Sequence, residues 1–194
     1  MTSSDASLSN RWKYWRPIYR FTWALAQSSS YRDFNAHLRG EAKKVLDIGS
    51  GTGEYIKSLR TDCQFYFSDI EAASLAKAKS RAQRYLRPGS FHFLQADAHE
   101  AIKQVPSVDV ISLLHVISVI PEPQKLIEEA YDKLSPGGEL LIYISRMSKR
   151  FADVEGVMFR QLGFDTVDLM SMRSDWEIKK VGALNERYRL VKPY

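Results

Sequence analysis

The chain has 194 residues, of which 44% are hydrophobic and 26% are charged, and its formal net charge at pH 7 is +5. This size and composition are typical of one soluble globular domain that can bury a sizeable core. No apolar run approaches the ~20 residues that cross a bilayer, and residues 1–10 lack the basic start and apolar block of a secretory signal. We therefore expect a cytoplasmic protein without a transmembrane segment.

The positive charge is concentrated near the N-terminus. Residues 1–44 hold eight Lys or Arg against three Asp or Glu, whereas the rest of the chain is neutral, and they also hold three of the four tryptophans. Such a local excess indicates a contact region for a partner or a surface. The single cysteine, Cys63, excludes an internal disulfide, and no histidine pairs with another ligand at metal spacing, so no metal site is expected.

Strand-like and helix-like segments alternate between residues 44 and 145. Short apolar or aromatic runs predict strands over residues 44–49, 63–69, 91–97, 108–114 and 139–145. Helices are expected to open at residue 53 and to cover residues 71–86, 98–105 and 122–134, the last stopped by Ser-Pro-Gly-Gly. This alternation implies parallel strands with right-handed crossovers, which is a doubly wound, Rossmann-like α/β fold.

The pattern changes after residue 145. A helix is expected over residues 151–164, followed by two strands over residues 165–174 and 186–193. The stretch between these strands, residues 175–185, is expected to be a connection.

The stretch VLDIGSGTGEY, residues 45–55, ends the first expected strand in a glycine-rich turn. In an open α/β sheet, ligands bind at the carboxyl ends of the strands, so this turn marks the site. Gly49, Gly51 and Gly53 form a G-x-G-x-G pattern, whereas the dinucleotide fingerprint has its last glycine one residue later, where this chain has Glu54. An acid there would repel a pyrophosphate, and the chain lacks a P-loop G-K-[ST]. The turn therefore argues against NAD, FAD and ATP.

S-adenosylmethionine (SAM), a nucleoside without phosphates but with an amino-acid end, suits this turn. Its ammonium and sulfonium groups favour nearby acids, and Asp47 lies two residues before the first glycine. The glycines let the backbone approach such a ligand closely. We therefore expect Asp47 to attract the ammonium, directly or through water.

The ends of the next two strands carry matching side chains. Asp69 can accept hydrogen bonds from both ribose hydroxyls, and Ile70 can pack on the adenine. Asp97 can accept from the adenine amine, and the Ala98 backbone NH can donate to a ring nitrogen. The alternative for both acids is a helix cap, since a helix is expected to follow each of them.

These segments together resemble the class I SAM-dependent methyltransferases. The resemblance runs in order through VLDIGSGTGE, FYFSDIEAASLAKAK, FHFLQADAHE, VDVISLLHVISVIPEP and LSPGGELLIYIS, which cover roughly residues 43–145. It implies a seven-stranded sheet in the order 3-2-1-4-5-7-6, with the last two strands as an antiparallel hairpin. It implies SAM as cofactor, bound by Asp47, Gly49, Ser50, Gly51, Thr52, Gly53, Asp69, Ile70, Asp97, Ala98 and Leu114.

His115 is the candidate general base. It follows the expected strand over residues 108–114, whose end faces the methyl group in this family. A base is needed only where the acceptor must lose a proton, and the alternative is that His115 packs locally without chemistry. The chain has no Asn-Pro-Pro-Tyr or Asp-Pro-Pro-Tyr here, which argues against nucleic-acid bases as substrates.

The N-terminal segment is the candidate acceptor region. HVISVIPEP with LSPGGEL, and WRPIYRF before the core, resemble segments of bacterial phospholipid N-methyltransferases and ubiquinone/menaquinone methyltransferases, although Arg20 replaces their usual acid. We expect residues 1–42 to form a helical lid and acceptor segment and residues 43–194 the SAM-binding core. Tyr19 is expected to position the acceptor, and the substrate residues are Tyr14, Trp15, Tyr19 and Arg20.

Two alternatives for this segment are peripheral contact with an anionic membrane through residues 10–27 and a helix packed on the flank of the sheet. The expected function is methyl transfer from SAM to a small molecule, lipidic or aromatic. The alternative functions are methylation of a protein or nucleic acid, and SAM binding without transfer.

Overall fold

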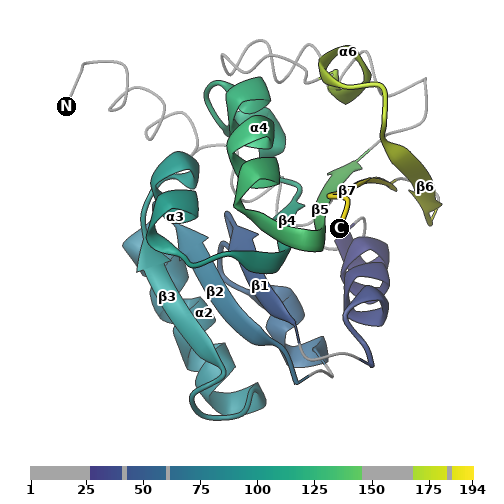
Figure 1. Cartoon of the computed structure of the whole chain (residues 1–194). Helices are drawn as coiled ribbons and strands as arrows, with labels where there is room; N and C mark the ends of the chain where they lie inside the picture. The colour runs from purple at the N-terminus through teal and green to yellow at the C-terminus, as the bar shows by residue number, and fades with distance from the viewer. Residues whose placement is uncertain (1–26, 41–42, 60–61, 146–167, 183–184) are drawn as a thin grey trace, which may run out of the picture.

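The computed structural model describes residues 27–40, 43–59, 62–145, 168–182 and 185–194 (Figure 1). Its strands are β1 (Lys44–Ile48), β2 (Gln64–Asp69), β3 (Phe91–Gln95), β4 (Val108–Leu114), β5 (Leu134–Ser145), β6 (Glu177–Val181) and β7 (Asn185–Val191). They form one sheet in the order β3-β2-β1-β4-β5-β7-β6, which confirms the predicted fold.

Strand direction brings the candidate residues to one edge of the sheet. The first five strands pair in parallel, whereas β7 runs antiparallel to both β5 and β6. Parallel strands end at a common edge, so the loops that follow β1, β2, β3 and β4 converge there. This carboxyl edge therefore collects the glycine turn, Asp69, Asp97 and His115.

The helices are α2 (Ala72–Tyr85), α3 (Ala98–Gln104), α4 (Pro123–Lys133) and the short α6 (Leu169–Met172). Two 3-10 segments, η1 (Glu54–Ser58) and η2 (Ile117–Val119), follow β1 and β4, and residues 27–37 are also helical. Figure 1 shows α3 and α4 covering one face of the sheet. Residues from 27–37, η1 and α2 share the core on the other face.

β4 divides the two cores because its side chains alternate between the faces. Ile111 and Leu113 join the core under α3 and α4, whereas Val110 and Leu114 join the opposite core with Phe34 of residues 27–37. A strand buried on both faces is the reason for the nearly continuous apolar sequence of residues 108–114.

Three of the predicted elements need correction. The helix expected to open at residue 53 is only the five-residue η1. The strand expected over residues 165–174 is wrong where the structure describes it, because Leu169–Met172 form α6. The Asp168 side chain accepts a hydrogen bond from the Met170 backbone N at 3.1 Å, which caps this turn.

The sixth strand, β6, lies instead within residues 175–185, which were expected to be a connection. β6 is an edge strand with four of its five residues exposed, so it lacks the apolar alternation that identifies a half-buried strand. The helix expected over residues 151–164 lies outside the described residues.

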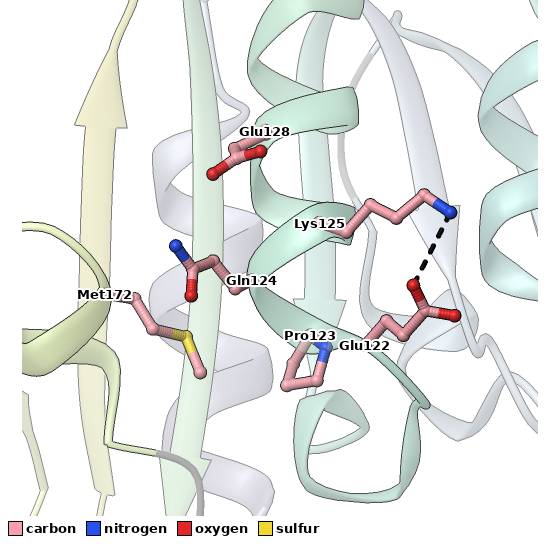
Figure 2. Close-up of a pocket in the computed structure, with 6 residues that line it drawn as sticks. All are labelled: Glu122, Pro123, Gln124, Lys125, Glu128 and Met172. Carbon is pink, nitrogen blue, oxygen red and sulfur yellow. Dashed lines mark ion pairs between the residues drawn. The ribbon is translucent and has the colours of Figure 1, made fainter.

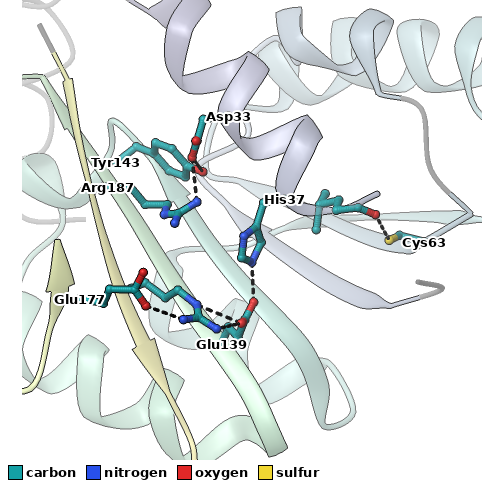
Figure 3. Close-up of polar contacts among 9 residues, drawn as sticks. Asp33, His37, Cys63, Glu139, Tyr143, Glu177 and Arg187 are labelled. Atoms are coloured by element: carbon teal, nitrogen blue, oxygen red, sulfur yellow. Dashed lines mark hydrogen bonds and ion pairs between the residues drawn. The ribbon is translucent and has the colours of Figure 1, made fainter. Parts of the chain in front are cut away.

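An anchor cluster of Asp33, His37, Glu139, Arg187 and Arg189 ties residues 27–37 to β5 and β7. Figure 3 shows the first four of these side chains. Asp33 accepts from Arg187 at 2.8 Å and from the Tyr143 hydroxyl at 3.0 Å. His37 Nε2 lies 2.5 Å from Glu139 Oε2, and Arg189 Nε donates to the same carboxylate at 3.0 Å. Residues 27–40 of the expected lid segment thus pack on the sheet, and residues 1–26 lie outside the described part of the chain.

Candidate functional site at the carboxyl edge of the sheet

The three glycines of the turn after β1 all have left-handed backbones, with φ of +71° at Gly49, +55° at Gly51 and +67° at Gly53. A Cβ on Gly49 would lie 2.5 Å from the Val116 side chain, and one on Gly53 would lie 2.5 Å from Ile56 Cδ1. A Cβ on Gly51 would meet nothing within 4 Å. Packing therefore requires glycine at the first and third positions, whereas Gly51 presents bare backbone to open space.

The residues between the glycines fix the shape of the turn. Ser50 donates through its backbone N and its Oγ to the Ser68 carbonyl, at 2.8 Å and 3.2 Å. The Arg81 guanidinium of α2 donates to the Thr52 carbonyl and pairs with the Glu54 carboxylate. The charge of Glu54 is thus partly offset by Arg81, a partner that the local sequence does not show.

Asp69 lies beside the open middle of the turn. Its Oδ2 accepts from the Gly51 backbone N at 2.8 Å, and its Oδ1 accepts from the Glu71 backbone N at 2.9 Å. The next residue, Ile70, is 72% exposed, which is unusual for a large apolar side chain. The structure therefore brings a carboxylate, bare backbone and an exposed apolar surface together, as a nucleoside site requires.

Asp97, Ala98 and Leu114 occupy less open positions. Asp97 caps α3 by accepting from the Glu100 backbone N at 2.9 Å, so the capping role holds, and its contact with adenine stays a prediction. Ala98 and Leu114 are buried, at 8% and 9% exposure, and the Leu114 side chain belongs to the core that includes η1. Contacts of these two residues with a cofactor also stay predictions.

Asp47 is fully buried behind the turn, at 0% exposure. The Ser112 hydroxyl of β4 donates to its Oδ1 at 2.6 Å, and the Tyr55 hydroxyl of η1 donates to its Oδ2. Burial raises the pKa of Asp47 to about 7, against the effect of these hydrogen bonds, and the nearby Asp69 carboxylate raises it further. The expected attraction of an ammonium by Asp47 stays a prediction.

His115 directly follows β4 and has a left-handed backbone with φ of +60°, which is strained for a residue other than glycine. Its backbone N donates to the Tyr143 carbonyl at 3.0 Å, and its Nε2 lies 3.0 Å from Ser30 Oγ. Burial lowers the pKa of His115 to about 4, so the imidazole is neutral at physiological pH. The next residue, Val116, lies against Gly49, so His115 is close to the glycine turn.

The predicted acceptor residues Tyr14, Trp15, Tyr19 and Arg20 lie outside the described residues. The structure adds Ser30, Tyr55 and Ser112, which sequence reasoning missed. Ser112 carried a signal, because it is a polar residue within the apolar, buried stretch of residues 110–114. Ser30 and Tyr55 carried none, since their partners lie on other elements.

A separate hollow of about 450 Å³ lies at the start of α4 (Figure 2). Its lining comes from Glu122, Pro123, Gln124, Lys125, Glu128 and Met172, none of which belongs to the predicted cofactor set. Among the described residues, no group of three or more potential metal ligands is found, and no helix is long and apolar enough to span a membrane.

The residues of the turn are compatible with SAM. The space beside the Gly51 backbone, which the Cβ of another residue would enter, can admit a ligand. Asp69 and Asp47 are acidic residues at this edge, and acids suit a cofactor that carries positive charge. The exposed Ile70 offers an apolar surface for a flat base. The residues of this edge thus fit an unphosphorylated, cationic nucleoside.

A family model described as "Methyltransferase domain" matches residues 46–140. Phosphatidylethanolamine N-methyltransferase of Cereibacter sphaeroides is 26% identical over 179 residues, which cover 91% of this chain and 85% of that protein. Ubiquinone/menaquinone biosynthesis C-methyltransferase UbiE of Rhizobium etli is 29% identical over 103 residues, 51% of this chain and 40% of that protein. The chain thus spans less than half the length of this second relative.

Solved structures show the same fold. N-methyltransferase NodS of Bradyrhizobium japonicum, in complex with S-adenosylhomocysteine, has a TM-score of 0.60 at 16% identity, over 84% of this chain and 87% of that one. Phospholethanolamine N-methyltransferase 2 of Haemonchus contortus has a TM-score of 0.66 at 17% identity, over 86% of this chain and 53% of that one. With this sheet order and a methyltransferase model that spans the glycine turn through most of β5, the chain belongs to the class I SAM-dependent methyltransferases.

Proposed function

We propose that this methyltransferase acts on a small-molecule acceptor with a lipidic or aromatic body, which approaches the carboxyl edge beside His115. The observation that carries the proposal is the strained, neutral His115, held at the end of β4 against Ser30 of residues 27–37. The relatives support the acceptor class, because their names include a phosphatidylethanolamine methyltransferase and quinone methyltransferases.

The cofactor would be held by the turn and the ends of β2 and β3. Gly51 would admit it to the backbone, Asp69 would accept from its ribose, and Ile70 would pack on its adenine. Asp97 and Ala98 would meet the edge of the base. SAM supplies a methyl group already activated on a sulfonium, so the chain's residues mainly have to hold the acceptor in line and exclude water.

His115 would accept a hydrogen bond from the acceptor's hydroxyl or ammonium proton. A pKa of about 4 leaves the imidazole uncharged at neutral pH, but it also makes the imidazole a weak proton acceptor. The proton would therefore pass on to solvent rather than stay on His115. The same pKa removes a cation that would repel a cationic cofactor.

The N-terminal segment would complete the acceptor site. Tyr14, Trp15 and Tyr19 would cover it, with Tyr19 orienting the acceptor and Arg20 meeting an acidic group, as aromatic and cationic side chains do in lids. Residues 10–27 would also contact an anionic membrane surface, where each basic residue contributes about 1 kcal/mol. This surface contact would give a lipid acceptor access to a protein that otherwise stays in the cytoplasm.

Release of S-adenosylhomocysteine tests this function. The full chain would be incubated with SAM and, in separate reactions, with anionic vesicles containing phosphatidylethanolamine, a dispersed phenolic quinol, a mixed peptide library and a duplex oligonucleotide. We expect release with one of the first two acceptors only. Release with the peptide or the oligonucleotide would favour a macromolecular substrate, and SAM binding without release in any arm would favour a protein that binds SAM without transferring methyl.

Co-sedimentation separates the membrane proposal from the lipid acceptor. The full chain should pellet with anionic vesicles at low salt, leave them at high salt and ignore neutral vesicles, because salt screens charge within a Debye length. If anionic vesicles never retain it, the membrane contact is wrong, whereas methylation of a dispersed acceptor can still stand.

A further inference from the structure

Groups from η1, β4, β2 and residues 27–37 surround Asp47. η1 contributes the Tyr55 hydroxyl and β4 contributes the Ser112 hydroxyl, and both donate to the carboxyl group. β2 contributes Asp69, which acts on Asp47 through its negative charge. Residues 27–37 contribute Tyr31, whose ring centroid lies 5.3 Å from that of Tyr55.

None of these neighbours supplies a positive charge. The Tyr31 hydroxyl donates to Gln27 Oε1 at 2.5 Å, and burial raises the pKa of both Tyr31 and Tyr55, so the two phenols stay protonated. In the described part of the chain, Asp47 therefore faces only hydroxyls and a second carboxylate. A buried carboxylate without a cationic partner is costly by several kcal/mol, and two hydrogen bonds recover only part of that cost.

We propose that Asp47 carries a proton in the free protein near neutral pH and releases it to solvent when SAM binds at the glycine turn. The ammonium and sulfonium of the cofactor replace that proton as the charge that balances the carboxylate. Tyr55 is the positioning residue, because its hydroxyl stabilises the ionised form and so sets the pH at which the exchange occurs. The inference rests on the proposed function, since it places the cofactor at this turn.

The exchange makes cofactor affinity depend on pH in one direction. With the pKa of Asp47 at about 7 in the free protein, binding at lower pH must expel a proton, and binding at higher pH need not. The affinity for SAM should therefore fall by about tenfold for each pH unit below that value and level off above it. SAM can affect the ionisation of the buried Asp47 without touching it, because charges interact strongly through a low-dielectric interior.

Two phenol variants separate positioning from packing. Tyr55→Phe removes a hydrogen bond to the ionised carboxyl, so the midpoint of the affinity profile should move to higher pH by on the order of one unit. Tyr31→Phe is the matched control, because it loses a hydroxyl from the same aromatic group whose partner is Gln27 rather than Asp47. Its midpoint should stay where the wild-type midpoint lies.

Calorimetric titration of SAM into the full chain tests the proposal, from about pH 5.5 to about pH 8.5, in two buffers of different ionisation enthalpy that together count released protons. We expect close to one proton released at the low end and none at the high end. A pH-independent affinity without proton release would overturn the inference and leave the proposed function standing. Absence of SAM binding at every pH would overturn both.

A second readout needs no cofactor, and it measures the titration of Asp47 in the wild-type protein. The ¹³C carboxyl resonance of Asp47 in the free wild-type protein, assigned with Asp47→Asn, should titrate near neutral pH. A midpoint close to the ordinary Asp value of about 4 would overturn the inference even if SAM binds tightly.

Discussion

The glycine turn and the anchor cluster each contain a buried acid, and the pKa of the two acids is shifted in opposite directions. In the anchor cluster, burial alone would raise the pKa of Glu139, but hydrogen bonds from His37 and Arg189 lower it to about 2. At the turn, Asp47 is buried more completely and, among the described residues, receives hydroxyl donors only, so its pKa rises to about 7. In the free protein Glu139 has cationic partners, whereas Asp47 would gain one only from a bound ligand. The contrast fits our proposal that the anchor cluster contributes to stability and the glycine turn binds a positively charged ligand.

Gly51→Val should have the largest effect, because it fills the open face of the turn. We expect SAM binding to be lost, as measured by calorimetry. Gly89→Val is the matched control, since Gly89 also has a left-handed backbone, with φ of +83°, and no neighbour within 4 Å of a Cβ. Both variants should lose about 1–2 kcal/mol of stability from backbone strain, but only Gly51→Val should lose the ligand. Equal SAM affinity in the two variants would show that the cofactor does not bind at the glycine turn.

Arg187→Met should be the most damaging change in the anchor cluster. The Arg187 and Asp33 side chains are 8% and 12% exposed, and removing one partner of a buried pair costs about 3–5 kcal/mol. Lys179→Met is the control, because Lys179 pairs with the same carboxylate but is 55% exposed, where such pairs contribute under about 1 kcal/mol. Urea unfolding measures both. Similar losses in the two variants would show that burial does not decide the strength of this anchor.

His115→Ala should lower turnover by about 100-fold at saturating SAM, with little change in SAM affinity. A base must be deprotonated to act, so the wild-type rate should stay level as pH falls toward 5 and drop only near the pKa of about 4. Ser30→Ala, which removes the side-chain partner of His115, should reduce turnover less. Turnover that survives His115→Ala would mean that positioning alone carries the reaction.

The two acids should shape the pH dependence of stability in opposite directions. Asp47 binds its proton more tightly in the folded protein, so its contribution is lost as pH rises from about 4 through about 7, and Asp47→Asn should remove that decline. Glu139 binds its proton less tightly when folded, so its contribution is present above about pH 4.5 and is lost as pH falls toward 2, a loss that Glu139→Gln should remove. Thermal unfolding across this range measures both. Unchanged profiles in the two variants would show that neither acid is perturbed.

Much of the fold could be predicted from the sequence because the parallel strands contain short apolar runs, and because a glycine follows β1 and an acid ends β2. The nearly continuous apolar sequence of residues 108–114 indicates a strand buried on both faces, and the glycine spacing after β1 indicates the turn. β6 could not be predicted, since an exposed edge strand has no apolar pattern, and Leu169–Met172 fit a strand as well as a helix.

The positions of the candidate site residues could be predicted from the sequence, but their partners on other elements could not. The acids Asp69 and Asp97 could be located because Asp69 ends β2 and Asp97 follows β3 by two residues. The partners that decide the chemistry come from other elements: Tyr55 and Ser112 on Asp47, Arg81 on Glu54, and Ser30 on His115. Such pairings depend on how the elements pack, so no local pattern contains them.

A crystal structure of the full chain with S-adenosylhomocysteine and the acceptor identified by the release assay would show whether both ligands bind at the carboxyl edge. We predict the adenosyl group over Gly51, its ribose on Asp69 and its base against Ile70, with the accepting atom of the second ligand on the His115 side of the sulfur. Density for the cofactor away from this turn, such as in the hollow at the start of α4, would contradict it.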